Sequence, residues 1–154
     1  MKVRALLTSL TFCLVAAGFC LAAQGFIASW KLDEAKSKFP PGASKNTTVV
    51  YEAAGDSIKV TLAGIGGDGK PTHSEWTGKF DGKDYPSTGS TIDDARAYTK
   101  IDDHTLHVVL KKGGKSVATA HIVTSADGKT RTVTVTTTDA NGKKVTSTAF
   151  YDRQ

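Results

Sequence analysis

Short runs in which apolar and polar residues tend to alternate make up most of the chain after residue 23, and they are rich in Val, Thr, Ile and Tyr. Two examples are TLHVVL at 105–110 and TRTVTVTTT at 130–138. Glycine-containing turn signals separate the runs: Gly55-Asp56, Asp68-Gly69-Lys70, Asp81-Gly82-Lys83, Gly113-Gly114-Lys115, Asp127-Gly128-Lys129 and Asn141-Gly142-Lys143. This pattern predicts antiparallel strands joined by tight hairpins. An α/β fold is excluded, because parallel strands need long crossovers and only DEAKSK at 33–38 has the character of a short helical turn.

One glycine-rich stretch satisfies two nucleotide-binding patterns. AGIGGDGKP at 63–71 contains both G-x-G-x-x-G and G-x-x-x-x-G-K. Both motifs work only between a strand and a helix, whose N-terminal amides hold the phosphate. Here a strand pattern, THSEWTGKF, follows, and Pro71 stands where a magnesium-binding Ser or Thr is needed. The stretch is therefore predicted to be a turn.

The turn signals also predict strand register, which decides the side chains that face the interior. With Gly55-Asp56 as a two-residue turn, Tyr51 lies opposite Val60 and Glu52 opposite Lys59, so one face is apolar and the other is salt-paired. With Gly113-Gly114 as a two-residue turn, one face carries Leu106, Val108, Leu110, Val117, Thr119, His121 and Val123.

Three-residue loops at 102–104, 126–128 and 140–142 keep this apolar face continuous through the C-terminal half. They add to it Arg96, Tyr98, Val133, Val135, Val145, Ser147, Ala149 and Tyr151. The outer face then carries Val109, Ile122 and Phe150.

The pattern as a whole predicts an all-β fold. About nine or ten antiparallel strands form an up-and-down meander, and a meander of this length without covering helices is expected to close into a lipocalin-like barrel. A barrel of this size can hold one small ligand. An open sandwich of two sheets is the alternative.

The first residues of the chain indicate the cellular location of the protein. Residues 1–23 have a basic start, an apolar run and small residues at Ala22 and Ala23, as in a secretory signal peptide cleaved after Ala23. An uncleaved membrane anchor is the alternative. We expect a periplasmic or secreted bacterial protein whose mature part, residues 24–154, is a single barrel domain without stable membrane insertion. Both cysteines, Cys13 and Cys20, lie in the removed segment, so the domain has no disulfide.

Charge adds little to this picture. The whole chain carries a formal net charge of +5, part of which leaves with Lys2 and Arg4. The remaining bases recur in ones and twos near turns, where lysine guards strand edges against aggregation. A nucleic-acid partner is not expected, and the protein is expected to be a monomer.

Three stretches resemble the calycin group, which comprises the lipocalins and the intracellular fatty-acid-binding proteins: ASWKLDEAKSKF at 28–39, KIDDHTLHVVLKKGGK at 100–115 and TSTAFYDRQ at 146–154. The resemblance implies a ligand-holding barrel. The chain also resembles small secreted bacterial proteins of unknown function that share W-K-L-x-x-A-K-S-K-F and D-G-K-D-Y-P. Fatty-acid-binding proteins close with an R-x-Y pair for the ligand carboxylate, whereas the matching positions here are Ala149 and Tyr151, so the tyrosine of the pair is present and the arginine is not.

The candidate ligand-binding residues are the polar and aromatic groups of the predicted inner face: Arg96, Tyr98, His121, Tyr151 and Trp76. A small-molecule site is usually an apolar cavity with a few convergent polar groups. We expect Arg96 and Tyr98 to fix the polar head of an amphipathic ligand, with His121 and Tyr151 nearby. The alternative places Arg96 outside, paired with Asp93 or Asp94.

The function predicted from these residues is binding of a small apolar or amphipathic molecule in the barrel interior. The alternative is a structural or protein-interaction module with a packed core, acting through outer residues such as Val109, Ile122 and Phe150. No catalytic arrangement, metal site or cofactor motif is recognised. For an enzyme, His121 near Arg96 or Glu75 would be the candidate group.

Overall fold

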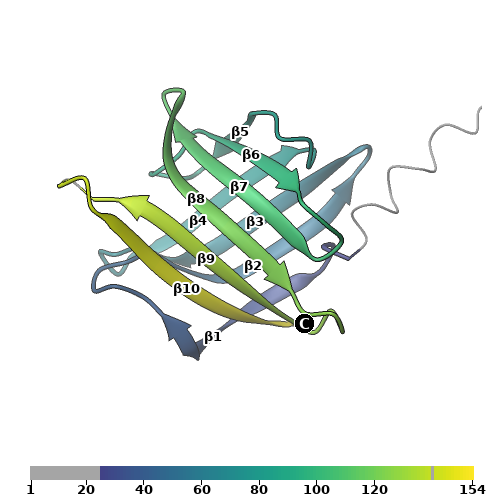
Figure 1. The fold of residues 1–154 in the computed structure, drawn as a ribbon, viewed down its shortest axis with the longest axis horizontal. Coiled ribbons are helices and arrows are strands. Elements are labelled where there is room, and N and C mark those ends of the chain that lie inside the picture. The colour runs from purple at the N-terminus through teal and green to yellow at the C-terminus, as the bar shows by residue number, and fades with distance from the viewer. Residues whose placement is uncertain (1–24, 140) are drawn as a thin grey trace, which may run out of the picture.

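The computed structural model describes residues 25–139 and 141–154, which form a closed barrel of ten antiparallel strands (Figure 1). The predicted signal peptide lies outside the described residues. The strands are β1 (Ser29–Lys38), β2 (Lys45–Ala54), β3 (Ser57–Ile65), β4 (Pro71–Gly78), β5 (Tyr85–Thr88), β6 (Ala95–Lys100), β7 (Thr105–Lys112), β8 (Lys115–Thr124), β9 (Thr130–Thr138) and β10 (Lys144–Arg153).

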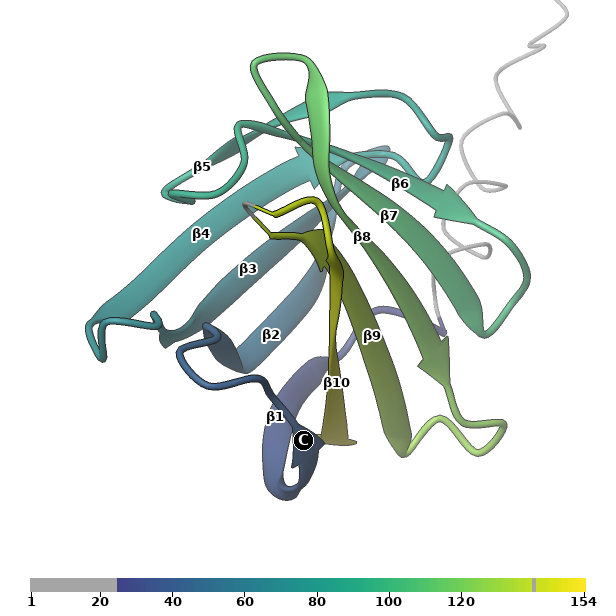
Figure 2. The same cartoon turned by 60° about the vertical axis from the view of Figure 1, so that its left-hand side comes forward.

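Each strand pairs with the next along the chain, and β10 pairs with β1 to close the barrel. Figure 2 shows the strands curving around one interior, with β2–β4 on one side and β6–β9 on the other. The all-β, up-and-down barrel predicted from the sequence is therefore confirmed, and the open sandwich is not formed. A closed ten-strand barrel is consistent with the calycin-like architecture. Among the described residues, no helix is long and apolar enough to span a membrane.

Most of the predicted turns and registers are confirmed. Tyr51 pairs with Val60 and Glu52 with Lys59 across the turn at 55–56. The loops at 102–104 and 140–142 give the predicted β6–β7 and β9–β10 registers. The middle of AGIGGDGKP, residues 66–70, is a turn between β3 and β4, in which the Gly66 amide donates to the Lys70 carbonyl (2.8 Å).

The register of β8 is wrong in the prediction by one residue. Pairing passes from Lys111–Ser116 to Leu110–Ala118, so Val117 is an extra, bulged residue. A one-residue bulge moves every later side chain of the strand to the other face. The inner face therefore carries Ala118, Ala120 and Ile122, and the outer face carries Thr119, His121 and Val123.

A second difference cancels the first. The Ser125 amide donates to the Thr130 carbonyl (2.8 Å), so the β8–β9 loop has four residues, 126–129, and not three. This restores the phase, and Val133 and Val135 face inward as predicted. Residues 33–38 are not a helical turn but the irregular half of β1, where the Lys36 amide and the Ser37 hydroxyl bond to Asp33.

The two ends of the barrel differ. At one end, the floor, the chain start at 25–28 and the connections β2–β3, β4–β5, β6–β7 and β8–β9 meet. The buried ring of Trp76 lies 4.3 Å from that of Tyr98 and 6.4 Å from that of Phe80, and Phe80 packs edge-on against Phe26. At the other end, the mouth, the connections β1–β2, β3–β4, β5–β6, β7–β8 and β9–β10 meet, and the interior is not filled.

Candidate functional site

A cavity of about 260 Å³ occupies the barrel interior between the mouth and the floor. Its wall is apolar and comes from alternate positions of five strands: Val49, Leu62, Val108, Leu110, Ala120, Ile122, Val133 and Val135. At the mouth it is lined by exposed residues, among them Thr72, His73 and Thr91, so it reaches solvent there. Toward the floor it is lined by Tyr51, Tyr98, Arg131 and Tyr151.

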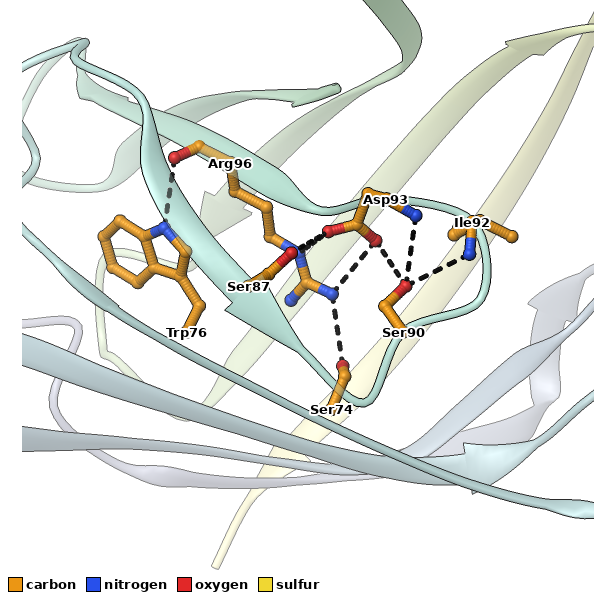
Figure 3. A network of polar contacts seen from close by, with 7 residues as sticks. All are labelled: Ser74, Trp76, Ser87, Ser90, Ile92, Asp93 and Arg96. Atoms are coloured by element: carbon orange, nitrogen blue, oxygen red, sulfur yellow. Dashed lines mark hydrogen bonds and ion pairs between the residues drawn. The ribbon is translucent and has the colours of Figure 1, made fainter. Parts of the chain in front are cut away.

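Two arginines line this cavity, and they differ in their polar partners. Arg96, on β6, is 4% exposed and points inward as predicted. Its Nε lies 2.7 Å from Asp93 Oδ2, and its Nη2 lies 3.2 Å from Asp93 Oδ1 (Figure 3). Nη2 also donates to the Ser74 hydroxyl (3.1 Å). Arg96 is thus inside the barrel and paired with Asp93, which combines the two readings that the sequence left open.

The Asp93 carboxylate is the centre of this network. It is 1% exposed, and the hydroxyls of Ser87 and Ser90 each donate to it at 2.5 Å. Burial acts to raise the pKa of Asp93, but the hydrogen bonds and charge of Arg96 outweigh burial and hold the pKa below its usual value. The buried pair is therefore fully ionised at neutral pH, and its charges cancel within the protein.

This pair also shapes the mouth. Residues 89–94 connect β5 to β6 and lie along the cavity, and Asp93 and Ser90 tie them to β6 and to Ser74 on β4 (Figure 3). A side chain at Gly89 would meet the His73 carbonyl at 2.4 Å, and Gly89 has a φ of +75°. The segment therefore approaches β4 closely only because glycine stands at this position.

The other predicted site residues separate into three groups. Tyr98 lines the cavity, and burial, with Tyr51 beside it, raises its pKa far above the usual value, so it stays protonated. Trp76 is buried in the aromatic floor, where its Nε1 donates to the Arg96 carbonyl (3.0 Å), and it does not line the cavity. His121 is exposed on the outer face of β8 opposite His107, so its predicted inward placement is wrong because of the bulge at Val117.

Tyr151 lies on the inner face of β10 as predicted, directly across the ladder from Arg131 on β9. Its hydroxyl donates to the Asn46 carbonyl (2.9 Å). Burial raises the pKa of Tyr151 to about 12, against the lowering influence of the Arg131 charge. The hydroxyl therefore keeps its proton across the physiological range.

Arg131 is the second arginine of the interior, and it was not singled out from the sequence. It is 4% exposed, and its guanidinium carbon lies 4.7 Å from the ring centre of Trp30 and 5.0 Å from those of Tyr51 and Tyr151. Within the described part of the chain it has no hydrogen bond and no carboxylate partner, and its Nε is buried without an acceptor. The alternation that places Val133 and Val135 inward also places Arg131 inward, so the signal was present in TRTVTVTTT.

Unsatisfied polar atoms gather around this residue. Three buried side-chain atoms of the described residues lack a hydrogen-bond partner: Trp30 Nε1, Thr124 Oγ1 and Arg131 Nε. Arg131 contacts the Trp30 ring and pairs with Thr124 across the β8–β9 ladder. Since buried polar groups are nearly always hydrogen-bonded, a cluster of three at one place indicates a polar site rather than a closed core.

The remaining chemistry of the described residues is limited. They contain no group of three or more His, Cys, Asp or Glu side chains arranged to hold a metal ion. Comparison of the sequence with models of known protein families gives no match, and comparison with curated proteins gives none either.

Proposed function

We propose that the protein is a binding protein that holds one small, partly apolar molecule inside its barrel. The observation that carries this proposal is the cavity of about 260 Å³, with its apolar wall and its polar residues at both ends. Protein interiors are close-packed, and voids larger than a water molecule are few. A cavity of this volume at the centre of a small barrel is therefore best understood as a ligand site.

The cavity volume limits the size of the ligand. Sites for drug-sized molecules span roughly 300–1,000 Å³, and this cavity lies just below that range. The apolar wall favours a hydrocarbon body, and the polar groups at the mouth and floor favour a molecule with at least one polar end. In this respect the proposal extends the lipocalin-like resemblance to a ligand smaller than a long-chain lipid.

We propose that this binding takes place in the periplasm or outside the cell, where the signal peptide predicted at residues 1–23 would direct the protein. A carrier or scavenger of a small molecule suits that location, and it requires no enzymatic step. The proposed function is therefore that of a secreted barrel that binds a small ligand.

Filling the cavity tests the proposal. Ala120 lines the cavity, whereas Thr119 beside it faces outward. We expect the mature wild-type protein to take up Nile red, a neutral apolar probe, and Ala120→Phe to abolish uptake while circular dichroism shows an intact sheet. Thr119→Phe is the matched control and is expected to retain uptake. Absence of uptake by the wild type, or equal uptake by both variants, would show that the interior does not bind small molecules and would favour a packed interaction module.

A further inference from the structure

We infer that the ligand is a small monocarboxylate and that Arg131 binds its carboxylate at the floor of the cavity. This inference rests on the proposed function, because it assigns the chemistry of the molecule that the cavity holds. It begins from an electrostatic imbalance in the described residues: the interior holds two buried guanidinium groups and only one buried carboxylate.

A buried guanidinium without a counter-ion is costly, because it loses its hydration and its donors remain unpaired. The rings of Trp30, Tyr51 and Tyr151 offset part of this cost, since each cation–π contact contributes about 0.5–2 kcal/mol. Ring faces, however, do not accept hydrogen bonds from the N–H donors, which lie in the plane of the guanidinium group. Arg131 therefore retains both a charge and hydrogen-bonding capacity that an anionic ligand can meet.

The protein's own carboxylates do not meet them. Asp93 is committed to Arg96 at the mouth. Asp152 is adjacent to Tyr151 but exposed on the outer face of β10. No carboxylate of the described residues forms an ion pair with Arg131. The missing anion must therefore come from outside the chain.

The charge balance and the volume narrow the class of anion. One guanidinium neutralises one negative charge, whereas a dianion such as a phosphate monoester would leave a net charge buried in the floor. The planar fork of arginine matches a carboxylate in bidentate geometry. Val133 and Val135 follow Arg131 at every second residue, so an apolar wall extends about 13 Å along β9 from the charge. A short aliphatic or single-ring carboxylate fits this arrangement, with its charge at the floor and its body along the wall.

The test compares charged and neutral molecules of the same shape. Benzoate and hexanoate are titrated into the mature protein by calorimetry, with benzyl alcohol and 1-hexanol as neutral counterparts, and Nile red uptake is measured separately. We expect both carboxylates to bind, and Arg131→Met to weaken their binding by at least about 30-fold while Nile red uptake persists. Arg153→Met, which removes an exposed arginine of the same end, is the matched control and is expected to leave carboxylate binding unchanged.

The outcomes separate this inference from the proposed function. If the wild type takes up Nile red but binds the alcohols as tightly as the carboxylates, the cavity is a ligand site and the role of Arg131 is refuted. Equal loss of carboxylate and Nile red binding in Arg131→Met would also refute it, because Arg131 would then only support the fold. If the wild type takes up neither probe nor carboxylate, the proposed function itself fails.

Discussion

The two arginines of the interior are equally buried, at 4% exposure each, but they lie at opposite ends of the cavity and in different electrostatic settings. Arg96 at the mouth donates to Asp93 and Ser74, and the hydroxyls of Ser87 and Ser90 donate to Asp93, so the charge of Arg96 is cancelled and its geometry is fixed. Arg131 at the floor contacts three aromatic rings and, among the described residues, pairs with no carboxylate. The same side chain thus serves two purposes: a structural ion pair that fastens a connection, and a charge left available in an apolar cavity.

The largest effect is expected where the neutralised arginine loses its partner. Asp93→Ala leaves the Arg96 guanidinium buried and unpaired, and breaking a buried pair in this way costs about 3–5 kcal/mol. We expect the free energy of unfolding to fall by that amount in urea denaturation. Asp94→Ala is the control, because Asp94 is exposed and accepts one hydrogen bond from the Gly113 amide (2.9 Å), so its loss should cost about 1 kcal/mol or less. Equal losses in both variants would remove the distinction between the two sites.

The floor arginine should behave in the opposite way in the unliganded protein. Arg131→Met removes a buried charge that has no counter-ion and replaces it with a flexible apolar side chain. The variant no longer pays the desolvation cost of the buried charge, and this gain offsets the lost ring contacts. We therefore expect its free energy of unfolding to lie between about 1 kcal/mol below and about 2 kcal/mol above that of the wild type. Urea denaturation of ligand-free protein measures this. A loss as large as that of Asp93→Ala would mean that Arg131 is a structural residue and that the comparison fails.

Acid should distinguish the two ends as well. Burial tends to raise the pKa of Asp93, but Arg96 and the two serines hold it below its usual value. A carboxylate with a lowered pKa in the folded state contributes stability above its unfolded pKa of about 3.9, and this contribution is lost as the pH falls through the folded pKa.

We therefore expect wild-type stability to fall below about pH 4 with a component that Asp93→Asn lacks. Denaturation at a series of pH values between about 2 and 6 measures the difference between the two proteins. Since Arg131 forms no ion pair with Asp93, Arg131→Met should keep the wild-type pH dependence. Identical slopes for wild type and Asp93→Asn would contradict the role given to the buried pair.

The barrel was predictable from the sequence because the residues at most of its turns determine the turn type locally. Glycine and aspartate at 55–56 set a two-residue turn, and the register of β2 and β3 followed from the alternation on both sides. The loops at 102–104 and 140–142 were inferred from the same alternation, and Arg96, Tyr98 and Tyr151 were correctly placed inside.

The misplaced face of β8 has one physical source, which is that a bulge leaves little local signature in the sequence. Val117 and Ala118 are both apolar, so either can face inward, and the packing of the neighbouring strands decides between them. The error placed His121 inside and Ile122 outside, whereas Ile122 is 5% exposed and His121 is exposed. Asp93 was named from the sequence as a partner of Arg96, because it lies only three residues away. The rings around Arg131 come from β1, β2 and β10, and no single strand pattern contains that information.

The smallest effect on stability and on ligand binding is expected for substitution of His121. This substitution tests which part of the protein binds the anionic group of a ligand. His121 lies on the outer face of β8, so His121→Ala should change the free energy of unfolding by less than about 0.5 kcal/mol and leave benzoate binding unchanged. Ile122→Ala, one residue along, removes a buried core side chain and should cost about 2–5 kcal/mol, which makes it the control for strand phase. If His121→Ala weakened benzoate binding while Arg131→Met did not, the anion would be bound on the outer surface, and the unpaired guanidinium at the floor would need another explanation.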